Sequence, residues 1–232
     1  MSGSEPAGQY GVAVASEHAL VADAVRTSLA DRGFESTVLR WPGERLAGPR
    51  RPAPSRAGPD VGLLISDLDR WTRVRASTLL LSRVPVPWVV LTGAPDGPMW
   101  GAALEAGATL VLPSSTGFQE VCDALLVTAR GELTTPAPER ERLVGLWEAL
   151  LERREVVGQR VQSLTPREHE VLTMLYAGDP VARIAELLEI SPATVRSQVK
   201  AVLRKLQVNS QLGAVAALDD LMEMQELEGV AI

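Results

Sequence analysis

The segment from Leu164 to Leu218 limits the possible folds of this chain most strongly, because it contains several helix-start signals close together. Thr165 is a good N-cap, and Glu168 lies three residues further on, which completes a capping box. Further cap signals follow at Asp179-Pro180, Ser191-Pro192 and Asn209-Ser210. This spacing predicts four short helices, near residues 166–177, 180–188, 192–206 and 210–224.

The third of these predicted helices has a basic face and contains no acidic residue. Short helices of this kind are stable only when their apolar faces bury one another, which leaves the polar face in solvent. Capped short helices with one basic member are typical of a helix-turn-helix DNA reader, whose recognition helix enters the major groove. The residues expected to contact DNA are Thr194, Arg196, Ser197, Gln198, Lys200, Arg204 and Lys205. The plainer alternative is an ordinary solvated face of a small helical bundle.

The segment resembles the DNA-binding domain of the LuxR/FixJ-type transcription regulators. The resemblance rests on Thr165-Pro166-Arg167-Glu168, Ile184-Ala185, Thr194-Val195 and Arg204-Lys205-Leu206. Gln198 departs from it, because many relatives carry histidine there. The resemblance implies double-stranded DNA as a partner, and a homodimer formed through the fourth helix, which would expose Leu212, Val215 and Ala216.

The first 132 residues alternate between strand and helix patterns, which predicts a parallel sheet with helices on both faces. Strands are expected near residues 11–15, 36–39, 61–66, 87–92 and 109–112. Helices are expected near residues 19–32, 69–82, 99–106 and 118–130. Three of these helices are followed by a glycine that suits a left-handed terminator, at Gly33, Gly107 and Gly131.

This order of elements resembles the receiver domain of response regulators, on the motifs Ala15-Ser16-Glu17-His18, Val90-Leu91-Thr92 and Ala106-Gly107-Ala108. We therefore expect a flavodoxin-like α/β domain with five parallel strands over residues 1–132. A linker helix over 133–162 and an all-α helix-turn-helix domain over 163–232 would follow it.

The resemblance implies a phosphoryl-accepting site with Mg²⁺, but several residues that such a site needs are replaced. The acidic pair after the first strand is Ser16-Glu17, and the lysine position falls on Ser114. The acceptor position falls on Ile65, so Asp67 is a candidate acceptor only if the strand end is shifted by two residues. We therefore expect an atypical receiver domain that binds Mg²⁺ poorly, needs no cofactor and is not controlled by conventional phosphorylation.

DNA binding would then be controlled by a small molecule or by a protein partner, or it would be constitutive. A ligand pocket is one hypothesis, lined by Ser16, Glu17, Thr92, Trp100 and Ser114 at the carboxyl edge of the sheet. Against it, tryptophans lie more often in cores or interfaces, and Glu17 and Asp67 are equally well explained as helix caps or solvated loop acids.

Residues 41–60 and 139–162 each allow two interpretations. The first stretch is rich in proline and arginine, which favours an irregular surface insertion over an arm that contacts DNA phosphates or an acidic partner. The second keeps a 4-3 apolar spacing at Leu143, Trp147 and Leu150, which fits a long helix. That helix would form a parallel coiled coil or pack back onto the receiver-like domain.

The composition limits the remaining classes. A net charge of −6 over 232 residues excludes a generally basic nucleic-acid coat protein. The single cysteine, Cys122, fits a reducing cytosol, and the absence of a leader or a long apolar run predicts a cytoplasmic protein without membrane contact. No constellation of catalytic residues suggests an enzyme. The alternative to a DNA regulator is a protein-interaction module whose helical domain binds a partner instead of DNA.

Overall fold

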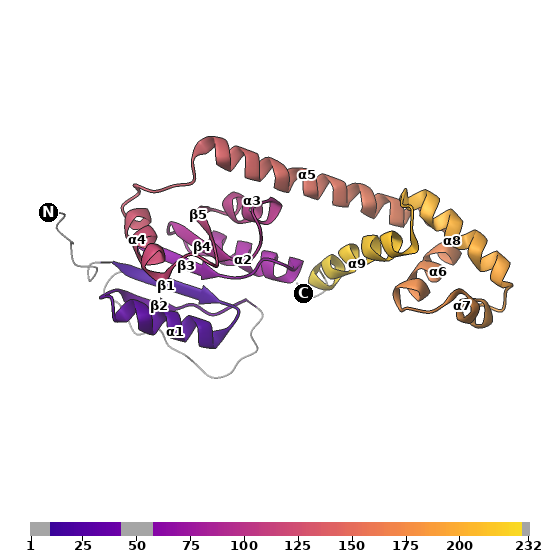
Figure 1. Ribbon diagram of the computed structural model, residues 1–232, viewed down its shortest axis with the longest axis horizontal. Helices are drawn as coiled ribbons and strands as arrows, with labels where there is room; N and C mark the ends of the chain where they lie inside the picture. Colours follow the sequence, from indigo (N-terminus) through magenta and orange to yellow (C-terminus); the bar gives the residue numbers. More distant parts are fainter. Residues whose placement is uncertain (1–9, 43–57, 229–232) are drawn as a thin grey trace. The chain divides into compact units, whose positions relative to one another are not determined.

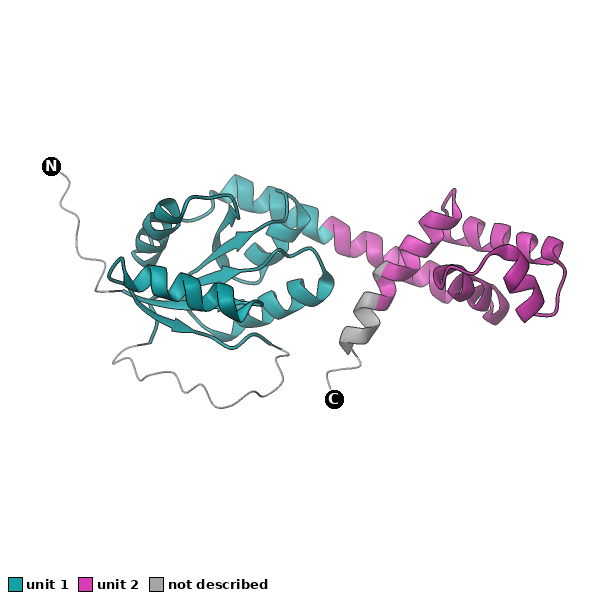
Figure 2. Cartoon of the chain, turned by 60° about the horizontal axis from the view of Figure 1, so that its bottom comes forward, with its two compact units in different colours: residues 1–148 teal, residues 149–232 magenta. Residues whose placement is uncertain are grey.

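The computed structural model describes residues 10–42 and 58–228, and the chain divides into two compact units, Met1–Glu148 and Ala149–Ile232 (Figure 2). The proline- and arginine-rich stretch of residues 43–57, for which an irregular insertion was predicted, lies outside the described residues.

The first unit contains one parallel sheet of five strands in the order β2-β1-β3-β4-β5 (Figure 1). The strands are β1 (Gly11–Ser16), β2 (Glu35–Val38), β3 (Val61–Ile65), β4 (Trp88–Thr92) and β5 (Ala108–Pro113). All four neighbouring pairs are parallel. This order is that of flavodoxin-like folds, so the predicted fold class is confirmed.

Helices cover both faces of this sheet. On one face, α1 (Ala19–Ala30) and α4 (Phe118–Ala129) contribute Leu29, Leu125 and the free Cys122 to a buried cluster with β1, β3 and β4. On the other face lie α2 (Trp71–Arg83) and α3 (Pro98–Glu105), which contact each other. The alternation of side chains along each strand explains why both faces are apolar.

The predicted helix terminators are confirmed. Gly33 (φ 88°), Gly107 (φ 111°) and Gly131 (φ 73°) all adopt the left-handed conformation just after α1, α3 and α4. The ends of β1 to β5 and of α1 to α4 lie within two residues of the predicted ones.

The division between the two units falls inside α5 (Ala137–Gln162). In the first unit, this helix packs back through Leu143 and Trp147, which are buried. The Trp147 indole N–H donates to Glu105 Oε2 (2.7 Å), and the rings of Trp71 and Trp147 lie 5.3 Å apart between centroids. Of the two predicted interpretations of the apolar spacing, packing onto the receiver-like domain therefore accounts for the first half of α5.

The second unit contains four helices after α5: α6 (Pro166–Tyr176), α7 (Val181–Leu187), α8 (Pro192–Leu206) and α9 (Gln211–Glu228). Their apolar faces form two buried clusters, one centred on α6, α8 and α9 and the other on α6, α7 and α8. Among the helices that the structure describes, none combines the length and apolarity needed to cross a membrane.

The cap predictions for these helices are confirmed in three cases and wrong in one. Thr165 and Glu168 form the full capping box, Ser191 accepts from the Thr194 N–H (3.1 Å), and Ser210 accepts from the Gly213 N–H (3.0 Å). Asp179 does not cap α7, because Pro180 occupies the N-cap position and no side chain bonds to that helix start.

Candidate DNA-reading helix and acidic edge

One face of α8 is buried and the opposite face is exposed. Val195, Val199 and Val202 are buried in the second unit and fix the rotation of the helix. Arg196 and Lys200 therefore point outward, and so does Arg204; all three are exposed. These three residues are called the basic row below.

The basic row is not neutralised within the described part of the second unit. No ion pair joins Arg196, Lys200 or Arg204 to an acidic residue among the residues that the structure describes. Two arginines on the neighbouring helices, the half-buried Arg167 and the exposed Arg183, differ in this respect. Arg167 pairs with Glu170 (2.7 Å) and Arg183 with Glu186 (3.3 Å). The three cations of the basic row are therefore available to an anionic partner.

The N-terminal half of α8 adds neutral polar groups to this surface. The Thr194 hydroxyl lies 2.8 Å from the Ser191 hydroxyl, and the Ser197 hydroxyl donates to the Ala193 carbonyl (3.1 Å). Thr194 and Ser197 are exposed, and Gln198 is half-buried. The hydroxyl oxygens can still accept hydrogen bonds, and the N-terminus of a helix favours anions.

Lys205 lies apart from the basic row, although it was predicted to contact DNA. Its Nζ is 2.6 Å from Glu168 Oε2 and 3.2 Å from the Ser163 carbonyl oxygen. Because this ammonium donates to Glu168, it lowers the pKa of that carboxyl, and the Thr165 backbone N–H (2.7 Å) acts in the same direction. Lys205 thus joins α8 to the capping box of α6.

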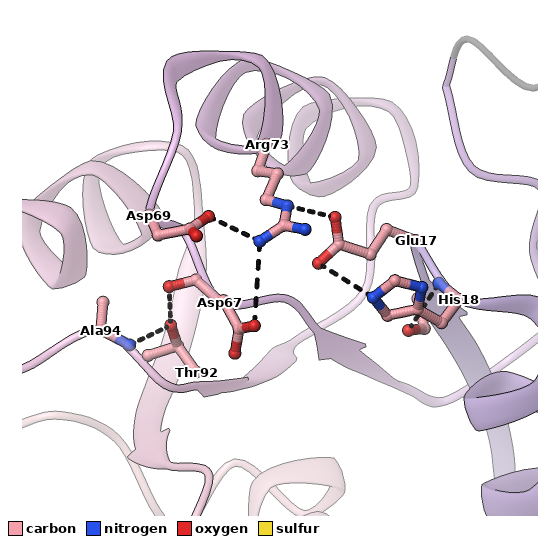
Figure 3. A network of polar contacts seen from close by, with 8 residues as sticks. Glu17, His18, Asp67, Asp69, Arg73, Thr92 and Ala94 are labelled. Atoms are coloured by element: carbon pink, nitrogen blue, oxygen red, sulfur yellow. Dashed lines mark hydrogen bonds and ion pairs between the residues drawn. The ribbon is translucent and has the colours of Figure 1, made fainter.

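In the first unit, the polar residues predicted from the sequence gather at the carboxyl ends of the strands (Figure 3). Glu17 follows β1, and Asp67 follows β3, its immediate neighbour in the sheet. The crossover connections leave β1 and β3 toward opposite faces, so these residues lie at the point where such folds bind ligands.

Arg73 of α2 fills the space between these acids, and the sequence did not single it out. Its Nε lies 2.5 Å from Glu17 Oε2, and its Nη1 lies 2.6 Å from Asp69 Oδ1 and 3.8 Å from Asp67 Oδ2 (Figure 3). The hydrogen bond to Asp69, followed by the attraction of Glu17, raises the pKa of the guanidinium despite its partial burial.

The residues at this edge do not fit the Mg²⁺ site that the receiver resemblance implies. Glu17 is engaged with a guanidinium, and Ser114 supplies no positive charge. Among the described residues, no group of three or more His, Cys, Asp or Glu side chains could hold a metal ion. Of the alternative acceptor positions, Ile65 is the last residue of β3, and only the exposed Asp67 is an acid.

The other residues of the predicted ligand pocket lie around the same edge. Ser16 is buried, and its hydroxyl accepts from the His18 N–H (3.2 Å). The Thr92 hydroxyl donates to the Asp67 carbonyl (3.0 Å) and accepts from the Ala94 N–H (3.1 Å). Both groups therefore already have protein partners.

Trp100 and Ser114 complete this predicted set. The Trp100 indole N–H donates to the Ala94 carbonyl (2.9 Å), which fixes the ring beside the loop after β4. A Cβ added at Gly93 would lie 3.7 Å from Ser114 Oγ and 2.6 Å from Asp67 Oδ1. Asp67 and Ser114 therefore both lie beside Gly93. A ligand at this edge remains a prediction.

Comparison with known proteins identifies the family of the chain. The family model described as "Bacterial regulatory proteins, luxR family" matches residues 162–218, which include the whole of α6, α7 and α8. The response regulator protein VraR of Staphylococcus aureus (strain Mu3 / ATCC 700698) is 30% identical over 156 residues, covering 67% of this chain and 70% of VraR. VraR of strain NCTC 8325 / PS 47 is 29% identical over 158 residues, covering 68% and 72%.

Solved structures of response regulators are similar as well. The response regulator ChrA of a heme-sensing two-component system is 24% identical, with 93% of this chain and 99% of ChrA covered and a TM-score of 0.42. Full-length FixJ from B. japonicum is 20% identical, with 91% and 97% covered and a TM-score of 0.38. The family assignment rests on VraR and on the luxR-family match: the chain belongs to the LuxR-type response regulators.

Proposed function

We propose that the chain is a sequence-specific transcription regulator that binds double-stranded DNA with α8. The observation that carries this proposal is the basic row, three exposed cations on one face of α8 that have no acidic partner among the described residues. Cations of this kind supply the salt-dependent part of DNA affinity by releasing counterions from phosphates.

The positions along α8 suggest a division of roles. Arg196 lies in the N-terminal half, which enters the major groove in helix-turn-helix proteins, so it is assigned to base edges together with Thr194, Ser197 and Gln198. Lys200 and Arg204 follow one and two turns later and are assigned to phosphates. Lys205 supports the orientation of α8 through Glu168.

The regulator would act as a homodimer on a roughly palindromic site. Leu212 on α9 is 77% exposed, and Ala216, one turn further on, is also exposed. An apolar residue this exposed favours a contact with a second copy. Half-sites would then lie about 10 base pairs apart or a multiple of that. Leu212→Glu is expected to give a monomer in analytical ultracentrifugation and to weaken binding to a two-half-site operator.

Control of the regulator would not involve conventional phosphorylation. The engagement of Glu17 by Arg73 and the serine at position 114 support this, because a phosphoryl site needs both a metal and a neighbouring cation. Incubation with acetyl phosphate and Mg²⁺ should leave the intact mass of the chain unchanged. A phosphoryl adduct that disappears in Asp67→Asn would contradict this part of the proposal. The input is then a small molecule or a protein partner, or binding is constitutive.

The experiment that tests the proposal is retention of a genomic DNA fragment pool by the full-length chain at two salt concentrations, without phosphodonor. Selective retention is expected, followed by a loss of about tenfold to hundredfold in affinity for Arg196→Ala on the selected operator. Arg153→Ala, which removes an exposed arginine from α5, is the matched control and should bind normally. If neither the full-length chain nor residues 149–232 retain DNA, the helical unit is instead a protein-interaction module.

A further inference from the structure

The geometry points to Arg73 as a built-in counter-ion that takes the place of a divalent cation at the carboxyl edge of the sheet. It holds the β1–α1 and β3–α2 connections together permanently, so the receiver-like unit adopts one arrangement without metal or phosphoryl group. This inference deepens the proposed function, since it concerns how the receiver-like unit is controlled.

The contacts of Arg73 come from two separate parts of the sequence. Its Nε contacts Glu17 after β1 (2.5 Å), while its Nη1 contacts Asp69 between β3 and α2 (2.6 Å). Because different nitrogens serve the two carboxylates, the planar guanidinium joins both at once, which a lysine could not do in the same geometry.

Partial burial strengthens these contacts. The Glu17 side chain is 12% exposed and the Arg73 side chain 25% exposed, so the pair is not an ordinary surface ion pair. Charges that are partly removed from water attract more strongly, and a carboxylate in that position needs a partner. Arg73 therefore supplies the positive charge that the Glu17 carboxylate needs, which a bound metal ion would otherwise supply.

A divalent cation is excluded from this position for the same reason. Mg²⁺ or Ca²⁺ requires carboxylate oxygens at roughly 2.0–2.6 Å, and Glu17 Oε2 already accepts from a positively charged group. Asp67 has one oxygen 3.8 Å from the Arg73 guanidinium and the other close to Gly93. A metal bound here would have to displace Arg73 and would be repelled by it.

The fixed arrangement extends to the loop after β4. The backbone carbonyl of Asp67 accepts from the Thr92 hydroxyl (3.0 Å), which in turn accepts from the Ala94 N–H (3.1 Å). The Thr92 hydroxyl therefore has its hydrogen bonds within the protein while Arg73 lies among Glu17, Asp67 and Asp69 (Figure 3). Three connections at the carboxyl edge thus share one network centred on the guanidinium.

The direction in which Glu17→Gln changes the melting temperature shows whether the acids at this edge have a counter-ion. In a site without a counter-ion, carboxylates repel one another, so Glu17→Gln would raise the melting temperature. With Arg73 in place, Glu17→Gln removes an attractive partner, and the melting temperature of the full-length chain in EDTA should fall by roughly 2–4 °C. A rise, or no change, in this variant overturns the inference.

A second experiment measures the binding of Mn²⁺ to the full-length chain by electron paramagnetic resonance. The wild-type chain should show no stoichiometric Mn²⁺ binding at millimolar concentrations. Arg73→Met, which keeps the length of the side chain without its charge, should melt at a lower temperature than the wild type in EDTA. Arg83→Met at the other end of α2 is the matched control, and it should match the wild type in both measurements.

Stoichiometric Mn²⁺ binding by the wild-type chain would overturn the inference. If Arg73→Met does not fold, the melting temperature of Glu17→Gln and the Mn²⁺ titration of the wild type still show whether Arg73 is the counter-ion. Neither measurement involves DNA, so their outcome is independent of the DNA-retention experiment. If the chain retains DNA but binds Mn²⁺, the role of Arg73 as counter-ion is refuted and the proposed function stands. If the chain binds no Mn²⁺ and retains no DNA, the proposed function is refuted and the role of Arg73 stands.

Discussion

At the scale of single residues, Lys200 and Lys205 show what the sequence could and could not reveal. They are the only lysines in the chain, and both lie in the predicted reading helix. Helical spacing predicted an exposed position for Lys200 correctly. It could not predict that Lys205 donates to Glu168, because that contact depends on how α8 packs against α6.

The two lysines should therefore respond differently to the same substitution. Lys205→Met leaves the mostly buried Glu168 carboxylate without its cation, which should lower the free energy of unfolding by about 1–3 kcal/mol. Lys200→Met should leave stability within about 0.5 kcal/mol of the wild type and weaken DNA binding. Urea unfolding and operator binding, measured on both variants, check this; equal stability losses would contradict the assignment of Lys205.

Glu168 also predicts a dependence of stability on pH. Its pKa in the folded protein is lowered, chiefly by the hydrogen bond from Lys205. Its contribution is therefore fully present above the usual carboxyl pKa of about 4.3, and is lost as the pH falls through the lower folded value. Melting temperatures measured during acidification should fall less in Glu168→Gln than in the wild type. Glu170→Gln, on the same helix and paired only at the surface, is the control.

At the scale of elements, local signals determined the helices of the second unit well, because caps act through neighbouring residues. Asp179 was the exception: the chain begins α7 at Val181, after Pro180, without a side-chain cap. The apolar spacing of α5 did not determine what α5 packs against. Leu143 and Trp147 face the first unit's α3, and this contact depends on a glycine, Gly101, that no periodicity marks.

The contact between α3 and α5 should be most sensitive to substitution at Gly101. A Cβ at this position would collide with the Leu143 carbonyl group, which is backbone and cannot rotate away. Gly101→Ala should therefore destabilise the first unit by about 1–3 kcal/mol.

Gly145→Ala is the matched control for this substitution. A Cβ at Gly145 meets nothing within 4 Å, so this change in the interior of α5 should stabilise the helix by roughly 0.5–1 kcal/mol. Chemical denaturation followed by tryptophan fluorescence would measure both variants. A neutral Gly101→Ala would show that α5 can move away from α3 without loss.

At the scale of the whole molecule, the sequence predicted the sheet, the acids at its carboxyl edge and the position of α8, but not the residue that joins those acids. Arg73 looks like any surface arginine of an amphipathic helix. Its partners, Glu17 and Asp69, belong to different connections and meet only because β1 and β3 are neighbours in the sheet. Ser16 and Ser114 at positions that the receiver resemblance assigns to charged residues were visible in the sequence, whereas the contact of Arg73 with Glu17 was not.

The net charge of the whole chain leads to a last prediction. At −6, the protein as a whole repels DNA, so binding must depend on the local basic row and be strongly weakened by salt. If the two cations of each protomer that are assigned to phosphates, Lys200 and Arg204, make these contacts, a dimer releases about four counterions, and its affinity should fall about 10²-fold between 50 and 200 mM salt. Lys200→Ala should reduce the salt dependence by about one counterion per protomer. A salt dependence unchanged by this substitution would mean that the basic row does not face the phosphates.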